Sequence, residues 1–345
     1  MKIQIEKYRQ KKRHREVIVG VQYSPTGRFL ASADQSGEII VWPGGHLRGA
    51  RRVCSPYSLL TGIWFSEDEE FLMAGHQGGC LLVYALPEFE LAAEIVLKTD
   101  HTNGPKVQKG ASGPLLNRVL LAVWPSNALN LYAILEFNDF FTIRREDFQI
   151  TNHIHLSGPL IECTAGSPHG RLLFLGDELG YISRLWLPEM KLENFARHCE
   201  EVQASDLTPE AAKTEDTPGI AALALSRNGK LIVSTSREGG VQIWHAQAER
   251  KEDSSWREFR PLVVRAPLQT GWIRGVCFLP NSTYLVLGGD KGTVEVWNFK
   301  SGKATEMLKC PSGVRCLDAS RDGSQLAVGC EDGSIFLIPW AQSII

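Results

Sequence analysis

Short runs of alternating apolar and polar residues recur along almost the whole chain. Each unit reads as an apolar strand, a polar turn with Pro, Asn, Asp or Gly, a second strand, a turn containing Gly, and a third strand that ends in a large apolar residue. This pattern fits seven segments, at residues 17–42, 60–84, 119–143, 161–186, 220–244, 272–297 and 314–338. Seven copies of one strand-rich unit predict an all-β repeat protein.

The spacing inside the units is nearly constant. The last residue of the first strand, which we call the anchor, and the large residue ending the third strand are 19 positions apart in six units and 20 apart in the fourth. The pairs are Tyr23/Trp42, Phe65/Tyr84, Trp124/Ile143, Gly166/Trp186, Leu225/Trp244, Phe278/Trp297 and Ala319/Ile338. The extra residue of the fourth unit, near Gly180 and Tyr181, predicts a β-bulge there.

Small residues recur in the same register. Six units have one three positions before the anchor, and the third unit has Leu121 instead. These residues are Gly20, Gly62, Cys163, Ala222, Gly275 and Cys316. Small side chains are expected where sheets converge on a common axis. The glycine before each final strand (Gly37, Gly79, Gly239, Gly292 and Gly333) suits a tight hairpin that needs a positive φ.

These features resemble the WD40-repeat family over nearly the whole chain. The matching motifs are Ser24-Pro25-Thr26-Gly27, Ser320-Arg321-Asp322-Gly323, Glu331-Asp332-Gly333, and Trp42, Trp186, Trp244 and Trp297 at third-strand ends. No unit ends in Trp-Asp, and the Gly-His dipeptide occurs only at Gly45-His46 and Gly75-His76. The family's Asp–His–Ser/Thr–Trp hydrogen-bond network is therefore expected to be mostly absent, which leaves apolar packing between blades as the main cohesion.

The resemblance implies a single seven-bladed β-propeller over residues 1–345, with four antiparallel strands in each blade. Third strands should end near residues 42, 84, 143, 186, 244, 297 and 338. In this family the chain start usually supplies the outermost strand of the last blade, and the alternating segment Lys2–Tyr8 fits that role. Such a strand closes the ring, so deletion of residues 1–8 should lower the melting temperature. Longer gaps between units predict extra loops near 98–113, 199–218 and 246–258.

Charge and composition narrow the function. The 37 basic and 39 acidic side chains give a formal net charge of −2, which argues against a general binder of polyanions. The eight cysteines are scattered without a CxxC pair and fit the buried, reduced thiols of a cytoplasmic or nuclear protein. No apolar run approaches the roughly 20 residues that span a bilayer, so the sequence predicts no membrane span.

Candidate catalytic and metal-binding patterns are sparse. The motifs GxxxxGK[ST], HExxH and GxSxG do not occur. His153 and His155 would place two imidazoles on one face of a strand, but the sequence identifies no third ligand. We therefore predict no metal, no cofactor and no catalytic residue.

The starts of the inner strands form the rim of the channel, where WD40 proteins commonly bind peptides or other proteins. The repeat register places Arg118, Glu162, Trp272, Arg274 and Arg315 on this rim. Arg and Trp dominate interface hot spots, and together they suit an acidic or aromatic-bearing segment through bidentate hydrogen bonds and stacking. The alternative is that Trp272 packs under the loop at 267–271 and the arginines are solvated.

A basic run near the N-terminus is a second candidate surface. It contains Lys7, Arg9, Lys11, Lys12, Arg13 and Arg15. The run could bind phosphate groups or an acidic partner, act as a nuclear import signal, or be a solvated loop on the same face as the acidic segment 200–216. One basic run gives no base readout, so sequence-specific nucleic-acid binding is not supported.

The sequence thus predicts a non-catalytic protein-interaction scaffold, a subunit or adaptor of a larger complex in the cytoplasm, the nucleus or both. Its partners would be proteins or peptides, including acidic segments. One alternative is a nucleic-acid- or chromatin-associated subunit that uses residues 7–15. Another is a propeller hydrolase, which would need an acidic or histidine cluster at the rim, where the sequence places one Glu and no His.

Overall fold

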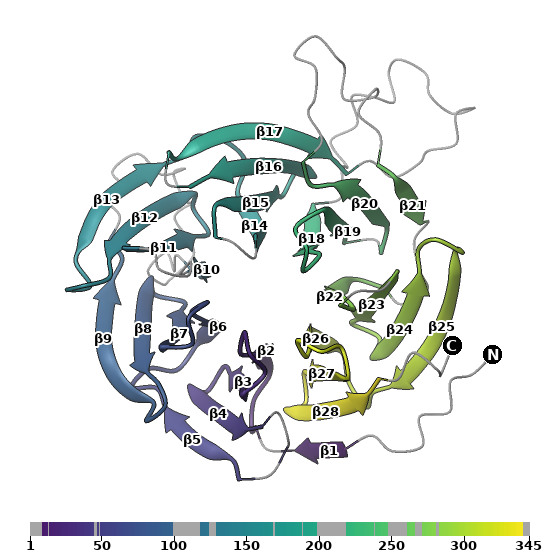
Figure 1. The fold of residues 1–345 in the computed structure, drawn as a ribbon, viewed down its shortest axis with the longest axis horizontal. Coiled ribbons are helices and arrows are strands. Elements are labelled where there is room, and N and C mark those ends of the chain that lie inside the picture. The colour runs from purple at the N-terminus through teal and green to yellow at the C-terminus, as the bar shows by residue number, and fades with distance from the viewer. Residues whose placement is uncertain are drawn as a thin grey trace, which may run out of the picture.

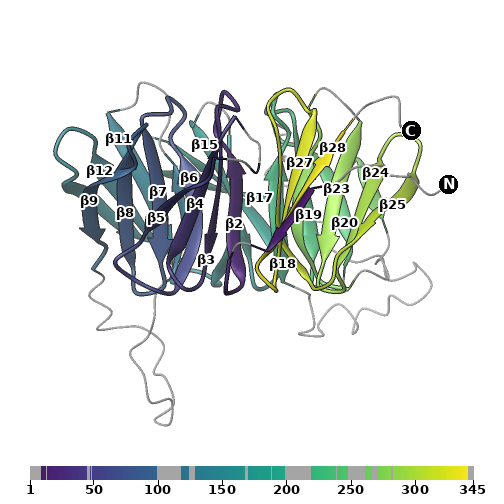
Figure 2. The ribbon, with the colours of Figure 1, turned by 90° about the horizontal axis from the view of Figure 1, so that it is seen from below.

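Seven four-stranded antiparallel sheets surround a common axis (Figure 1). The computed structural model describes residues 9–12, 14–44, 47, 49–98, 118–123, 129–167, 170–187, 189–198, 219–237, 239–247, 261–265, 271–280 and 283–340. Throughout these residues the regular structure is β-strand, and no helix long and apolar enough to cross a membrane occurs in them. From the side, the strands run between the two ends of a short cylinder (Figure 2). The predicted all-β, seven-bladed propeller is confirmed.

Each blade takes its first three strands, and all but the last blade its fourth, from one continuous stretch of chain. From inner to outer strand, the first three blades contain β2 (Ile18–Tyr23), β3 (Phe29–Asp34), β4 (Glu38–Pro43) and β5 (Arg51–Cys54); β6 (Leu60–Phe65), β7 (Phe71–His76), β8 (Cys80–Ala85) and β9 (Glu90–Val96); and β10 (Val119–Val123), β11 (Asn130–Leu135), β12 (Asp139–Arg144) and β13 (Ile150–His155). The next three contain β14 (Ile161–Gly166), β15 (Leu172–Asp177), β16 (Tyr181–Trp186) and β17 (Lys191–Arg197); β18 (Ile220–Leu225), β19 (Leu231–Ser236), β20 (Val241–His245) and β21 (Val263–Arg265); and β22 (Ile273–Phe278), β23 (Tyr284–Gly289), β24 (Thr293–Asn298) and β25 (Lys303–Lys309).

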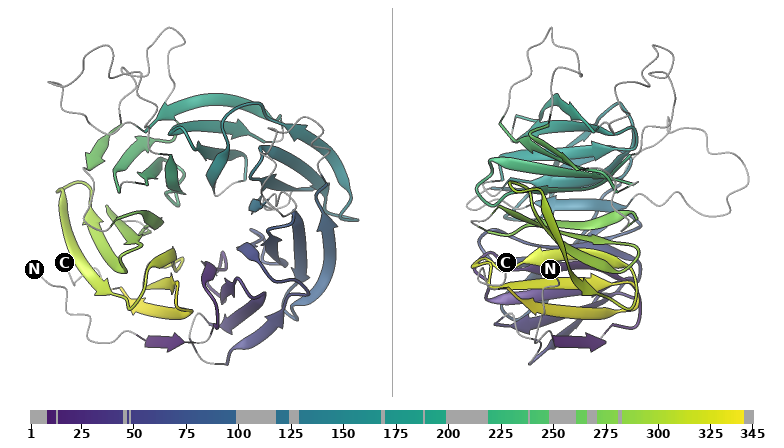
Figure 3. Two further views of the ribbon diagram at one scale, coloured as in Figure 1. Left: turned by 180° about the vertical axis from the view of Figure 1, so that it is seen from behind. Right: turned by 90° about the vertical axis from the view of Figure 1, so that its right-hand side faces the viewer.

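The seventh blade is completed by the start of the chain. It contains β26 (Val314–Ala319), β27 (Gln325–Cys330), β28 (Ser334–Pro339) and β1 (Arg9–Lys12). β1 pairs antiparallel with β28, from Arg9 opposite Leu337 to Lys12 opposite Ser334, and Figure 3 shows it at the outer edge of the ring. An N-terminal closing strand is therefore confirmed, but it lies later than Lys2–Tyr8, a segment outside the described residues.

Each inner strand carries one surplus residue at the same place. The pairing between first and second strands skips Val19, Thr61, Leu120, Glu162, Ala221, Arg274 and Arg315 in the seven blades. A β-bulge of this kind leaves one residue unpaired and redirects its side chain. The residue after each bulge is the small one predicted from the repeat, except Leu121. The sequence did not predict these seven bulges.

The fourth blade is more regular than the sequence indicated. Leu185 pairs with Leu173 as Trp42 pairs with Leu30, so Leu185 occupies the position of Trp42. Leu185 is fully buried, whereas Trp186 is partly buried and donates its indole N–H to Glu193 at 3.1 Å. The predicted bulge near Gly180 is wrong, because Trp186 stands one place beyond the true repeat position.

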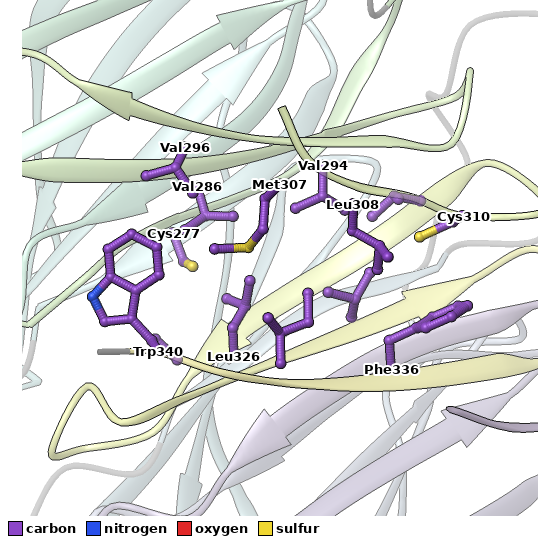
Figure 4. Packing of buried hydrophobic residues seen from close by; sticks show 14 of the residues in the cluster. Cys277, Val286, Val294, Val296, Met307, Leu308, Cys310, Leu326, Phe336 and Trp340 are labelled. Carbon is purple, nitrogen blue, oxygen red and sulfur yellow. The ribbon is translucent and has the colours of Figure 1, made fainter. Parts of the chain in front are cut away.

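Apolar packing between neighbouring blades forms the core. One cluster joins the sixth and seventh blades, with Val294 and Met307 on one side and Leu326 and Phe336 on the other (Figure 4). In the second strand of the sixth blade this close approach requires glycine: a Cβ on Gly288 would lie 2.5 Å from Val314 Cγ1 of the next blade. Real Cβ atoms do not come so near a neighbour, so no larger residue fits without a backbone shift.

The hydrogen-bond network expected to be mostly absent is present in part in two blades. His14 lies 2.6 Å (Nε2) from Ser32 Oγ and 3.2 Å (Nδ1) from Asp34 Oδ2. In the fifth blade, Ser234 Oγ lies 2.8 Å from His198 Nδ1 and accepts the indole N–H of Trp244 at 3.1 Å. Neither histidine follows a glycine, so the search for Gly-His missed both.

Candidate functional site

A cavity of about 270 Å³ lies where the inner strands begin. Its lining comes from six blades and consists of Val19, Gln35, Leu59, Leu60, Thr61, Gln77, Arg118, Ala221, Arg274 and Arg315. Five of these residues are the bulged residues of their blades. Equivalent residues of blades on opposite sides of the ring can line one cavity only at its axis. We therefore call this space the mouth cavity.

A second ring of side chains surrounds the mouth cavity, twelve positions after each anchor. It consists of Gln35, Gln77, Glu136, Glu178, Arg237, Asp290 and Glu331. In every blade the backbone N–H of this residue donates to the carbonyl six positions before the anchor, for example Glu136 to Arg118 at 2.9 Å and Asp290 to Trp272 at 3.1 Å. This repeated bond fixes the turn between second and third strands against the loop that enters the inner strand. The seven turns of the rim are consequently anchored in the same way.

Arg274 lies against the indole of Trp272. The guanidinium carbon is 3.4 Å from the ring centroid, and that of Arg237 is 5.4 Å from the same ring. Such contacts between a cation and an aromatic face are favourable and hold Arg274 in one orientation. Among the described residues, neither Nε of Arg274 nor Nε1 of Trp272 has a hydrogen-bond partner, although both atoms are buried. Two polar atoms of the rim are thus left without protein partners.

Both cationic and anionic side chains surround Arg274. Burial lowers the pKa of Arg274, and the nearby charge of Arg315 lowers it further, while Glu331 and Asp290 act in the opposite direction. Arg315 reaches Glu331 only at 3.7 Å. Because both guanidinium groups line the mouth cavity, an anion placed there would relieve their repulsion.

The other predicted rim residues pair with carboxylates or guanidinium groups. Arg118 forms a bidentate pair with Glu136, with nitrogen–oxygen distances of 2.9 and 2.6 Å. Glu162 pairs with Arg237 and does not line the mouth cavity. The structure thus brings Arg118, Arg274 and Arg315 together. Trp272 supports one of them and Glu162 holds Arg237 beside the same indole.

Sequence reasoning missed the second ring. Gln35, Gln77 and Arg237 belong to the turns between second and third strands, which we did not include in the rim. The signal was available, because these residues stand at one fixed distance from the anchors. Leu59, another missed lining residue, has a positive φ of 62° and an exposed side chain.

The basic run is not the loop that we expected. Arg9, Lys11 and Lys12 belong to β1, and Arg15 is exposed after it. Lys7 and Arg13 lie outside the described residues, as do the acidic segment 200–216 and most of the predicted long loops. Three of the six cations are therefore on a closing strand.

Two clusters contain residue types that bind metals. His14, Asp34 and Glu38 lie within 4.8 Å of one another, but Glu38 pairs with Arg52 at 2.6 Å. Burial alone would raise the pKa of Asp34, yet hydrogen bonds from His14, Ser36 and the Glu38 amide hold it well below its usual range. This buried cluster links His14, which follows the closing strand β1, to Asp34 and Glu38 of the first blade. The second cluster joins His153 and His155 to Asp139.

Comparison with known proteins agrees with this architecture. The family model described as "WD domain, G-beta repeat" matches residues 6–43, 212–245, 263–298 and 302–338. These matches fall on the first, fifth, sixth and seventh blades, three of which have Trp at the third-strand position.

A curated relative is the pre-rRNA-processing protein crb3/ipi3 of Schizosaccharomyces pombe. It is 22% identical over 264 residues, which cover 66% of this chain and 55% of the relative. The chain thus spans about half the length of the curated relative it matches. Four stretches of the chain thus match WD40 repeats, and all seven blades share the strand order of a β-propeller.

Proposed function

We propose that this protein is a non-catalytic scaffold that binds a partner protein at the mouth cavity, as a subunit or adaptor of a larger complex. The observation that carries the proposal is the pair Arg274 and Arg315, which line the cavity from neighbouring blades. Within the part of the chain that the structure describes, no carboxylate forms an ion pair with Arg274, and Arg315 reaches Glu331 only at 3.7 Å. Arg and Trp are the side chains that contribute most to binding at protein interfaces.

The partner segment should be acidic. A carboxylate in the mouth cavity could accept hydrogen bonds from Arg274 and Arg315 together, because a guanidinium group donates in a planar fork. Charge-assisted hydrogen bonds of this kind contribute about 1.5–3 kcal/mol each. The closed ring presents these donors already oriented, so binding costs little ordering entropy.

The chemistry of the rim favours binding over catalysis. Glu136, Glu162 and Glu331 face Arg118, Arg237 and Arg315. The carboxylate oxygens of these ion pairs are occupied by guanidinium groups.

The relative suggests where such a complex works. Its printed name assigns it to pre-rRNA processing, which favours a nuclear setting for this chain and a role in a complex of that kind. A nucleic-acid contact through residues 7–15 is a second candidate, favoured by the same name. Neutralising Lys11, Lys12 and Arg13 would then abolish a salt-dependent shift with RNA.

Affinity purification of the wild type beside a Trp272→Ala, Arg274→Ala variant tests the proposal. A matched control is Arg171→Ala, because Arg171 is an exposed arginine in a turn at the other end of the blades. We expect the double variant to lose at least one partner that the wild type and the control retain. That partner's acidic segment should bind the isolated wild type at least tenfold more tightly than the double variant. A partner set unchanged by the double substitution would remove the mouth cavity as the binding site.

A further inference from the structure

The two outer strands of the third blade bring two histidines and one aspartate together on one face. In the antiparallel pair β12 and β13, Asp139 stands opposite His155 and Phe141 stands opposite His153. Alternate residues of a strand share one face, so all four side chains project on the same side of the sheet. His153 and His155 were candidate ligands in the sequence, and the strand register adds Asp139 as the third.

Both imidazoles contact the same carboxylate oxygen. Nε2 of His153 lies 3.0 Å, and Nδ1 of His155 lies 3.1 Å, from Oδ1 of Asp139. The Asp139 side chain is only 1% exposed, whereas those of His153 and His155 are 36% and 54% exposed. A fixed, buried oxygen thus faces two imidazoles that remain open to solvent.

The surroundings hold two of these groups in place. The ring of His153 stacks on Phe141, with centroids 4.4 Å apart and an interplanar angle of 6°. Asn138, directly before Asp139, donates to the carbonyl of Pro159 at 2.9 Å and accepts the amide of Ile161 at 3.0 Å. These bonds tie the turn that carries Asp139 to the fourth blade. His155 is the most exposed of the three.

We infer that Asp139, His153 and His155 form a binding site for a transition-metal dication, of which Zn²⁺ fits best. Zinc takes imidazole nitrogen and carboxylate oxygen in tetrahedral sites, with water as the fourth ligand where the protein supplies three. Two nitrogen ligands disfavour Mg²⁺ and Ca²⁺, which prefer oxygen. The metal takes the place of the protons that now lie between the nitrogens and the carboxylate. Both imidazoles, including the His153 ring that stacks on Phe141, have to turn to bring their nitrogens together on the metal.

The bound metal would fasten an edge strand. β13 is the outermost strand of its blade and is held by β12 alone. A metal shared by Asp139 of β12 and the histidines of β13 bridges the two strands. Because the metal binds the folded site and not the separated residues, it should raise the melting temperature.

Calorimetric titration of the full chain with ZnCl₂, after removal of metals by a chelator, tests the inference. All variants also carry Cys54→Ser, because Cys54 is an exposed thiol and thiols bind zinc. We expect one zinc ion per chain and a melting temperature raised by several degrees. His153→Gln with His155→Gln should weaken binding at least tenfold and abolish the rise. The control His245→Gln, at another exposed histidine, should behave like the parent.

The ligand atoms can be read directly by long-range ¹H–¹⁵N spectra of the histidine rings. Zinc should shift Nε2 of His153 and Nδ1 of His155, the two atoms that face Asp139. Equal zinc affinity in the parent and the double-histidine variant would overturn the site. Shifts confined to the opposite ring nitrogens would exclude Asp139 as a ligand, and this readout remains valid if a variant folds poorly.

Discussion

Asp318 accepts a hydrogen bond of 2.7 Å from the backbone amide of Tyr23 and so joins the inner strand of the seventh blade to that of the first. Gln22 makes the equivalent bond to the amide of Phe65 at 2.8 Å, one blade further along. The ring is therefore closed at two radii, by β1 at the outer edge and by Asp318 near the axis.

The inner closure should depend on pH. Burial raises the pKa of Asp318 to about 6, although the amides of Tyr23 and Ala319 and the charge of Arg227 oppose the rise. In the unfolded chain an aspartate titrates near 3.9, so the folded state binds the proton more tightly. The resulting stabilisation is complete below about pH 4 and is lost as the pH rises through 6.

Asp318→Asn separates this effect from the hydrogen bond. The amide oxygen of Asn keeps an acceptor for Tyr23 but cannot ionise. We expect the difference in melting temperature, variant minus wild type, to increase as the pH rises from 5 to 7.5. Parallel melting curves over this range would show that Asp318 has an ordinary pKa.

Removal of the outer closure should destabilise the seventh blade. Deletion of residues 1–12 takes away β1 and exposes the edge of β28, whose partners are Ser334 to Leu337. We expect the melting temperature to fall by several degrees, and by clearly more than after deletion of residues 1–8. Differential scanning calorimetry measures both. Equal losses in the two deletions would place the closure before residue 9.

His198 should make the protein sensitive to acid. Burial lowers the pKa of His198 to about 4, whereas an unfolded histidine titrates near 6.5. The stability that this neutral imidazole contributes is present above pH 6.5 and is lost as the pH falls through 4. His198→Gln should therefore show a flatter loss of melting temperature between pH 6.5 and 4.5 than the wild type. The exposed residue His245 provides the control His245→Gln, which should keep the wild-type slope.

The contact between the sixth and seventh blades should not tolerate an added methyl group. Gly288→Ala would place a Cβ 2.5 Å from Val314 Cγ1. Overpacking of this kind costs about 1–3 kcal/mol, to be measured as the free energy of unfolding in urea. Gly166→Ala is the matched control, because its Cβ would meet neighbours at 3.4 Å, an ordinary contact distance. Equal effects of the two substitutions would mean that this close approach does not limit stability.

Much of the fold could be predicted because each repeat keeps the same spacing between its first and third strands. Alternation and a constant anchor distance fix the number of blades and the order of strands. The glycine before each third strand has the expected positive φ, for example 95° at Gly37 and 80° at Gly333. The prediction was wrong by one residue at Leu185 and Trp186. Two large apolar residues are adjacent there, and size alone does not tell which one is buried.

The candidate site was only partly readable for a different reason. The repeat alignment of the first strands was enough to place Arg274 and Arg315 on the rim. Contacts between strands depend on strand pairing, which the sequence of one segment does not reveal. Asp139 became a neighbour of His153 and His155 only through the β12–β13 pairing. His14 was missed because its partners Ser32 and Asp34 follow it by 18 and 20 positions, in the next blade.

The surplus residue of each inner strand lets the side chains at the mouth vary without disturbing the backbone pairing of the blade. Because the skipped residue has no partner on the second strand, its identity can change while every neighbouring backbone pair stays in register. The seven skipped residues already range from Val19 to Glu162 to Arg315. Diversification of the mouth among descendants of one propeller thus requires only point substitutions, with no insertion, no deletion and no rebuilding of a blade.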